Sequence, residues 1–166
     1  MKLSKAKLSH LIRGFSLIEI MVVIGIIAIL LTLAIPSQTG RITQKRVAET
    51  RDLFESYKPK IIRYYAETGE FPSDNAAILL PEPNKIIGNY LDKMEVNDGA
   101  MHLYFGQKFP TKLHGRILSI RPIYVEDSPG SPVSWICGND KVPTGMTATD
   151  ENLTDLEPLF LPINCR

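Results

Sequence analysis

The sequence is poor in the residues that enzymes and metal proteins most often use. Its 166 residues include two cysteines and three histidines, and His10 lies in the short segment before the first apolar run. Two cysteines with no nearby histidine are too few for a structural zinc site, which takes four ligands. The sequence also lacks HExxH, GxSxG and glycine-rich phosphate-binding motifs. We therefore expect no cofactor, no metal site and no enzymatic activity.

The remaining candidates for chemistry are weak. His102 falls on an expected strand and His114 in an expected turn, and we interpret each as an exposed or packing histidine. The acid pairs Glu126-Asp127 and Asp150-Glu151 lie in expected loops. Paired acids in such segments are usually solvated, so we favour solvation over a cation site.

Acidic residues are absent from the first thirteen positions, although the whole chain has a net charge of only +1. Residues 41–63 hold seven basic and three acidic side chains, whereas residues 64–166 hold eight and fourteen. Because DNA capture needs a basic face, the acidic 64–166 part predicts no direct nucleic-acid binding. The basic residues of that part that could still cluster are Lys108, Lys112, Arg116 and Arg121.

Charged residues are also absent from Ile20 to Ile35, where Thr32 is the only polar residue. As a helix, the 21 residues from Phe15 to Ile35 would be roughly 30 Å long, enough to cross a bilayer core. The basic flank before this run favours a cytoplasmic N-terminus. No A-x-A cleavage site follows Ile35, which favours a retained helix over a secretory signal peptide.

Glu19 is the one charged residue between Phe15 and Ile35. A carboxylate in an apolar span costs about 2.5–3.5 kcal/mol on insertion scales. In one interpretation Glu19 reaches the headgroups or becomes neutral. In the other it meets a cation, and cleavage after Gly14 would supply one as the free amine of Phe15.

The segment Gly14-Phe15-Ser16-Leu17-Ile18-Glu19, with a basic leader before it and an apolar helix containing Pro36 after it, closely resembles the class III signal of type IV pilins and pseudopilins. The resemblance implies that a prepilin peptidase cuts after Gly14 and methylates Phe15. It also implies that Glu19 pairs with the N-terminal amine of a neighbouring subunit. Such a pair would set the stagger between subunits more than it would add net stability.

The helical pattern continues after Pro36. Val47, Phe54, Tyr57, Ile61 and Tyr65 recur at spacings of one helix face, which predicts a helix from about Leu17 to Thr68. Pro36 and Pro59 should bend this helix or remove hydrogen bonds from it. Because it is longer than a small domain needs, its apolar N-terminal half should project from the body.

Strand patterns follow a loop region at residues 70–99 that contains a short helical turn near Asn75–Leu80. The expected strands are Tyr90–Val96, Ala100–Phe105, Arg116–Tyr124 and Val133–Cys137, and the turn Asn97-Asp98-Gly99 favours a hairpin. We predict an α+β fold in which a four-stranded antiparallel sheet packs on the C-terminal half of the long helix. Cys137 and Cys165 follow in a segment expected outside the cytoplasm, where an oxidising compartment favours a disulfide.

The resemblance to type IVa pilins extends over this second region, in the stretches YYAETGEFP, GRILSIRP, VSWICG and LPINCR. It implies a removed leader at 1–14, a transmembrane and filament-core helix at 15–40, and a globular domain at 41–166 closed by a Cys137–Cys165 disulfide loop. The implied function is a structural subunit of a type IV pilus, first in the inner membrane and then on the cell surface. The implied partners are other pilin subunits, the prepilin peptidase and the inner-membrane assembly machinery.

Two alternatives within the family stay open, a minor pilin for pilus priming or competence and a pseudopilin of type II secretion. The cysteine pair and the pilin-like C-terminal half disfavour the pseudopilin. A single-pass receptor or adhesion module would keep the helix but leave Gly14-Phe15 uncut.

Overall fold

The computed structural model describes residues 14–34 and 38–166, and the chain divides into two compact units between Gln38 and Thr39. The first unit contains helix α1 (Leu17–Ala34), and helix α2 (Gln38–Thr68) leads into the second. The single long helix expected over Leu17–Thr68 is therefore observed as these two helices. Pro36, the expected site of a bend, lies outside the described residues.

Helix α1 is apolar apart from Glu19 and Thr32, and its side chains from Leu17 to Thr32 are all exposed. Its start is capped by Ser16, whose Oγ accepts a hydrogen bond from the Glu19 backbone N–H at 3.2 Å. Within the described residues, no helix meets the length and hydropathy that a bilayer crossing requires.

Helix α2 packs one face on the sheet of the second unit. Val47, Phe54 and Ile61 on this face are at most 2% exposed, and Tyr57 is partly buried against the same core. The sequence spacing therefore identified the packed face correctly. Pro59 lies within α2 without ending it. Because Pro59 is exposed, the backbone N–H that proline lacks is missing on the solvent side of the helix.

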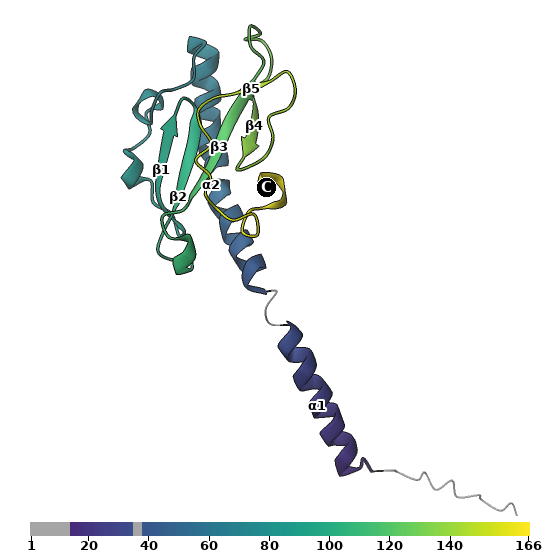
Figure 1. Ribbon diagram of the computed structural model, residues 1–166. Coiled ribbons are helices and arrows are strands. Elements are labelled where there is room, and N and C mark those ends of the chain that lie inside the picture. The colour runs from purple at the N-terminus through teal and green to yellow at the C-terminus, as the bar shows by residue number, and fades with distance from the viewer. Residues whose placement is uncertain (1–13, 35–37) are drawn as a thin grey trace, which may run out of the picture. The chain divides into compact units, whose positions relative to one another are not determined.

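The sheet lies against α2, with its long strands side by side in chain order (Figure 1). Its strands are β1 (Leu91–Asn97), β2 (Ala100–Phe105), β3 (Ile117–Tyr124) and β4 (Ser134–Cys137), and each pairs antiparallel with the next. The expected α+β fold and four-stranded antiparallel sheet are confirmed. A short fifth strand, β5 (Thr147–Ala148), also pairs with β3 and was not expected.

The β1–β2 hairpin closes at Asp98 and Gly99, as the sequence predicted. Both residues have positive φ, 43° and 76°, which is the backbone of the two-residue turn that suits the twist of a hairpin. The Gly99 N–H donates to the Pro72 carbonyl at 2.8 Å. A Cβ at Gly99 would come within 2.7 Å of the Phe71 ring, so glycine lets the turn pack against this ring.

The side chain of Asn75 covers the open edge of β1. Its Oδ1 accepts from the Val96 N–H at 2.7 Å, and its Nδ2 donates to the carbonyls of Met94 and Pro81. An edge strand with free backbone groups invites pairing with other chains, and Asn75 occupies these groups. The helical turn expected nearby is present as a 3-10 turn at Ala76–Ile78.

A disulfide joins Cys137, at the end of β4, to Cys165 in the last 3-10 turn, Ile163–Cys165. Gly138 follows β4 with φ 58°, and a Cβ there would collide with the Cys165 carbonyl. The expected disulfide loop is thus part of the fold. Glycine at position 138 leaves room for the backbone of Cys165, which the disulfide holds close to β4.

We predict that the double variant Cys137→Ser/Cys165→Ser unfolds more readily than the wild type. Loop-closure entropy for a crosslink spanning 28 residues gives a loss of about 3.5 kcal/mol in the free energy of unfolding. Denaturant unfolding in detergent solution measures it. A reductant should reproduce the loss in the wild type and change nothing in the variant, and equal midpoints for the two proteins would contradict the prediction.

Candidate functional site

The residues expected to act in processing and assembly lie together at the start of the described chain. Gly14 and Phe15 precede α1, and Phe15 is 78% exposed. Glu19 lies in the first turn of α1, where the positive end of the helix dipole favours a carboxylate. No ion pair of Glu19 occurs within residues 14–34 and 38–166, so this carboxylate is available to a partner.

Ser16 is a helix-capping residue whose role the sequence analysis missed. Its Oγ and its carbonyl both accept the Glu19 N–H, at 3.2 and 3.1 Å. The spacing Ser-x-x-Glu before an apolar run is a known helix-start pattern and could have identified it. This cap fixes where α1 begins, and therefore the turn on which Glu19 lies.

The exposed surface of α1 is apolar on every side. Ten of its aliphatic side chains are 46–70% exposed, namely Ile18, Ile20, Val22, Val23, Ile24, Ile26, Ile27, Ile29, Leu30 and Leu31. Soluble monomers rarely expose so much contiguous apolar surface. The helix is therefore suited to apolar surroundings.

A buried polar network joins β2, β3 and the segment after β5. His102 is 1% exposed, with its Nδ1 2.9 Å from Ser119 Oγ and its Nε2 2.8 Å from Asp150 Oδ2. A carboxylate only accepts hydrogen bonds, so Nε2 donates to Asp150, and Ser119 can then donate to Nδ1. Ser119 Oγ also accepts from the Leu153 N–H at 3.0 Å.

These contacts correct one expectation and refine another. Asp150 was expected to be solvated, but it is partly buried and bonded to both His102 and Asn97. His102 is a packing histidine, one of the two roles foreseen for it. Sequence alone could not pair residues 48 positions apart, because the contact depends on how the segment after β5 folds over β3.

Serine, histidine and aspartate also form hydrolase triads, but the geometry here is that of a clamp. Ser119 is fully buried, and its Oγ is already engaged by His102 and Leu153. A nucleophile must reach a substrate, and this hydroxyl meets only its own chain. The network holds residues 150–154 against the sheet.

Of the four basic residues that could have clustered, three lie in the connection between β2 and β3 and Arg121 lies in β3. Lys108 and Lys112 lie in the loop between β2 and β3, and Arg116 next to it forms an ion pair with Asp155 at 3.0 Å. Arg121 instead donates to the Asp150 carbonyl, and burial lowers the pKa of its guanidinium while Asp150 opposes that shift.

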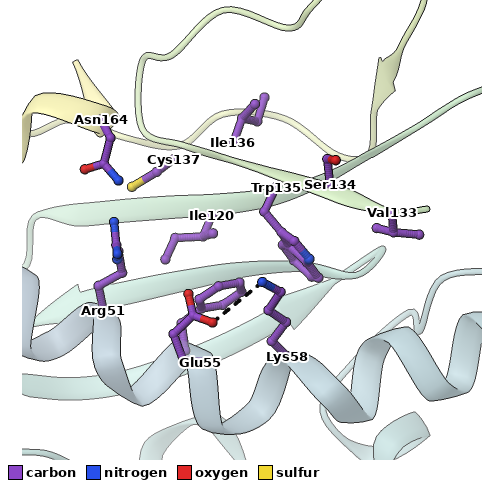
Figure 2. A pocket seen from close by; sticks show the side chains of 11 residues that line it. Arg51, Glu55, Lys58, Ile120, Val133, Ser134, Trp135, Ile136, Cys137 and Asn164 are labelled. Carbon is purple, nitrogen blue, oxygen red and sulfur yellow. Dashed lines mark ion pairs between the residues drawn. The ribbon is translucent and has the colours of Figure 1, made fainter.

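An open groove of about 430 Å³ runs between α2 and β4. Figure 2 shows Arg51, Glu55 and Lys58 projecting from α2 toward this strand. Lys58 lies 3.6 Å from Glu55 and 5.9 Å from the Trp135 ring centre. Because Lys58 and Glu55 already contact each other and Lys58 also contacts an aromatic ring, we interpret the groove as a packing feature of α2. Within the described part of the chain, no group of three or more His, Cys, Asp or Glu side chains could hold a metal ion.

Comparison with known proteins gives two matching family models. One is described as the prokaryotic N-terminal methylation motif and matches residues 10–35, and the other is described as pilin (bacterial filament) and matches residues 46–166. The chain is 30% identical over 163 residues to a fimbrial protein of Neisseria meningitidis, with 93% of this chain and 94% of the relative covered. It is 29% identical to the type IV major pilin protein PilE of Neisseria gonorrhoeae, with 93% of each chain covered.

A shorter match extends to a protein named for its processing. The chain is 33% identical over 92 residues to the prepilin peptidase-dependent protein D of Escherichia coli, with 55% of this chain and 62% of the relative covered.

We predict that Asp150→Ala destabilises the second unit by about 1–3 kcal/mol, because it leaves the buried His102 Nε2–H without an acceptor. Amide hydrogen exchange of residues 147–155 should accelerate, since the clamp holds this segment. Glu151→Ala is the matched control, because the neighbouring side chain is exposed and its loss should change stability by less than about 0.5 kcal/mol. Equal effects of the two substitutions would contradict the role of the network.

Proposed function

Given that the chain belongs to the type IV pilin family, we propose that it enters the inner membrane as a prepilin, is cut after Gly14, is methylated on Phe15 and polymerises into a surface pilus. The observation that carries this proposal is α1, whose apolar side chains are exposed on all sides. Such a helix suits the two environments in turn, a bilayer before assembly and a core of identical helices afterward.

The proposed parts of the chain follow the family pattern. Residues 1–14 form a leader that is removed, residues 15–40 form the membrane and filament-core segment, and residues 41–166 form the globular domain. Pro36 belongs to this proposed core segment. The match of the methylation-motif model to residues 10–35 supports this division.

Glu19 has a specific role in this proposal. After cleavage, Phe15 carries a free amine, and the Glu19 carboxylate of a neighbouring subunit pairs with it in the filament core. An unpaired carboxylate there would cost several kcal/mol, whereas a matched amine offsets much of that cost. The pair therefore selects one stagger between helices and disfavours the others.

The partners of the proposed function are other copies of the chain, a prepilin peptidase and an assembly machinery in the inner membrane. The name of the Escherichia coli relative, which refers to a prepilin peptidase, supports the processing step. The Neisseria relatives that are named as major pilins support a main structural subunit rather than a minor one. In this role the chain is a building block, and catalysis belongs to the enzymes that process it.

We predict that filaments sheared from cells contain a dominant species that begins at methylated Phe15. Its intact mass should be two hydrogens below that of the reduced chain, because of the disulfide. Replacing Gly14 with a bulkier residue should abolish this species and leave the uncut chain in the membrane fraction. An uncut wild-type chain in the membrane, with none in filaments, would contradict the proposed function.

A second prediction concerns Glu19→Ala. This variant should insert and be cut normally, because removal of the carboxylate makes the helix more apolar, yet filament yield should fall at least about tenfold as the favoured stagger is lost. The yield is measured by immunoblot of sheared filaments against the membrane fraction. Glu49→Ala, which removes an exposed carboxylate from α2, is the control, and a normal filament yield from Glu19→Ala would refute the pairing.

A further inference from the structure

The two ends of the sheet in the second unit are formed by different connections between strands. β1, β2 and β3 are antiparallel neighbours, so the β1–β2 turn and the β2–β3 loop lie at opposite ends of the sheet. The eight residues of β3 separate these ends by about 25 Å. The ends of the sheet also differ in charge.

One end of the unit is strongly acidic. It is formed by residues 66–73, 97–99, 124–133 and 147–151, which are joined by the contacts of Phe71 with Gly99 and with Tyr124 and by the pairing of β5 with β3. These segments contain no lysine or arginine. Their acidic residues are Glu67, Glu70, Asp98, Glu126, Asp127, Asp150 and Glu151. Arg63 pairs with Glu67 and Arg121 donates to the Asp150 carbonyl, so acids still outnumber the basic residues that contact this end.

A pocket of about 460 Å³ opens at this acidic end. Three aromatic rings line it, with ring centres 4.3 Å apart for Tyr65 and Phe71 and 5.5 Å apart for Phe71 and Tyr124. The carboxylates of Glu70 and Asp98 lie at its rim and are exposed. Aromatic faces and carboxylates both attract cations, so the pocket suits an alkylammonium group.

The carboxylates at the rim are free to bind. Within the described chain, neither Glu70 nor Asp98 forms an ion pair. The third carboxylate of the pocket, that of Asp150, is held by His102 and Asn97. A cation that entered the pocket would therefore pair with Glu70 and Asp98 over the aromatic rings.

The opposite end of the unit presents such a cation. The β2–β3 loop, residues 106–116, contains Lys108, Lys112 and Arg116 and no acidic residue. Arg116 is paired with Asp155, whereas both lysines are exposed and neither forms an ion pair within the described residues. Asp92 lies beside Gly106 at the start of the loop.

The β2–β3 loop is anchored to the core of its unit. Phe109 and Leu113 anchor it in the core, each 3% exposed. The Nε2 of His114 lies within hydrogen-bonding distance of the carbonyls of Gln107 and Phe109, at 3.0 and 2.6 Å. A loop that is already ordered loses little conformational entropy when it docks.

We propose that in the filament the β2–β3 loop of one copy docks at the acidic end of another, with Lys112 or Lys108 in the pocket lined by Tyr65, Phe71 and Tyr124. The inference rests on the proposed function, because it needs a filament. A contact between opposite ends of identical units is heterologous, and such a contact continues into an open helical polymer unless its rotation closes a ring. Charge complementarity within one sequence makes a second copy the fitting occupant.

Cysteine crosslinking in filaments tests the contact directly. The wild-type chain has no free cysteine within its described residues. We expect filaments of the double variant Glu70→Cys/Lys112→Cys, treated with copper phenanthroline as oxidant, to give a ladder of dimers, trimers and higher multimers on a non-reducing gel. Each single variant should stay monomeric, because one thiol per copy cannot link opposite ends.

The pair Glu70→Cys/Lys141→Cys is the matched control, since Lys141 is an exposed lysine outside the loop. It should give no ladder. A ladder from this control as well, or none from either Glu70→Cys/Lys112→Cys or Glu70→Cys/Lys108→Cys in filaments of normal yield, would overturn the proposed docking. An absence of wild-type filaments would instead contradict the proposed function.

Charge reversal gives an independent measure that does not depend on thiols. Glu70→Lys and Lys112→Glu should each lower the sheared-filament yield about tenfold, because each places like charges across the contact. The combined swap Glu70→Lys/Lys112→Glu should restore most of the yield, and Lys141→Glu should leave it unchanged. A swap that assembles no better than the single variants would overturn the pairing, whatever each substitution does to folding.

Discussion

Val47, Phe54 and Ile61 on one face of α2 are buried against the sheet, and the rest of the second unit is arranged around this contact. Each such side chain contributes about 1.5–3 kcal/mol on burial. Phe54 also meets the Trp135 ring edge-on at 4.9 Å between centres, which links the helix to β4. Since β4 ends at Cys137, the same contact places one end of the disulfide. The C-terminal segment is thus tied to a strand whose position the helix has already determined.

The contact was predictable because it depends on a repeat that the sequence displays. Val47, Phe54 and Ile61 recur every seven residues, a spacing that only a helix turns into one face. The hairpin at Asp98-Gly99 was equally readable, since few residues adopt positive φ without strain. Strand ends were displaced by about one residue, as with β1, expected from Tyr90 and observed from Leu91.

The features that sequence reasoning missed depend on single side chains and on distant pairing. β5 has two residues, too few to show an alternating pattern. The side chain of Asn75, in a loop about twenty residues before its partner in β1, forms hydrogen bonds that a neighbouring strand would otherwise form with this edge. No local sequence pattern identifies an asparagine with this role. Asp150 was judged by its acidic neighbour Glu151, whereas its environment is decided by His102. Hydrogen bonds between remote segments form only where the fold brings those segments together, so local sequence patterns do not reveal them.

Asp150 takes part both in the buried polar network and in the lining of the surface pocket. Its backbone φ is 49°, a left-handed conformation that aspartate adopts more readily than most residues, and its carboxylate is bonded to His102 and Asn97. With Asp150 held, the adjoining Thr149 and the Tyr124 ring complete the wall of the acidic-end pocket. A buried histidine with no solvent contact therefore shapes the place where another copy would dock. Asp150 thus belongs both to the buried network and to the lining of the pocket, so a substitution there would alter the internal fold and the proposed contact together.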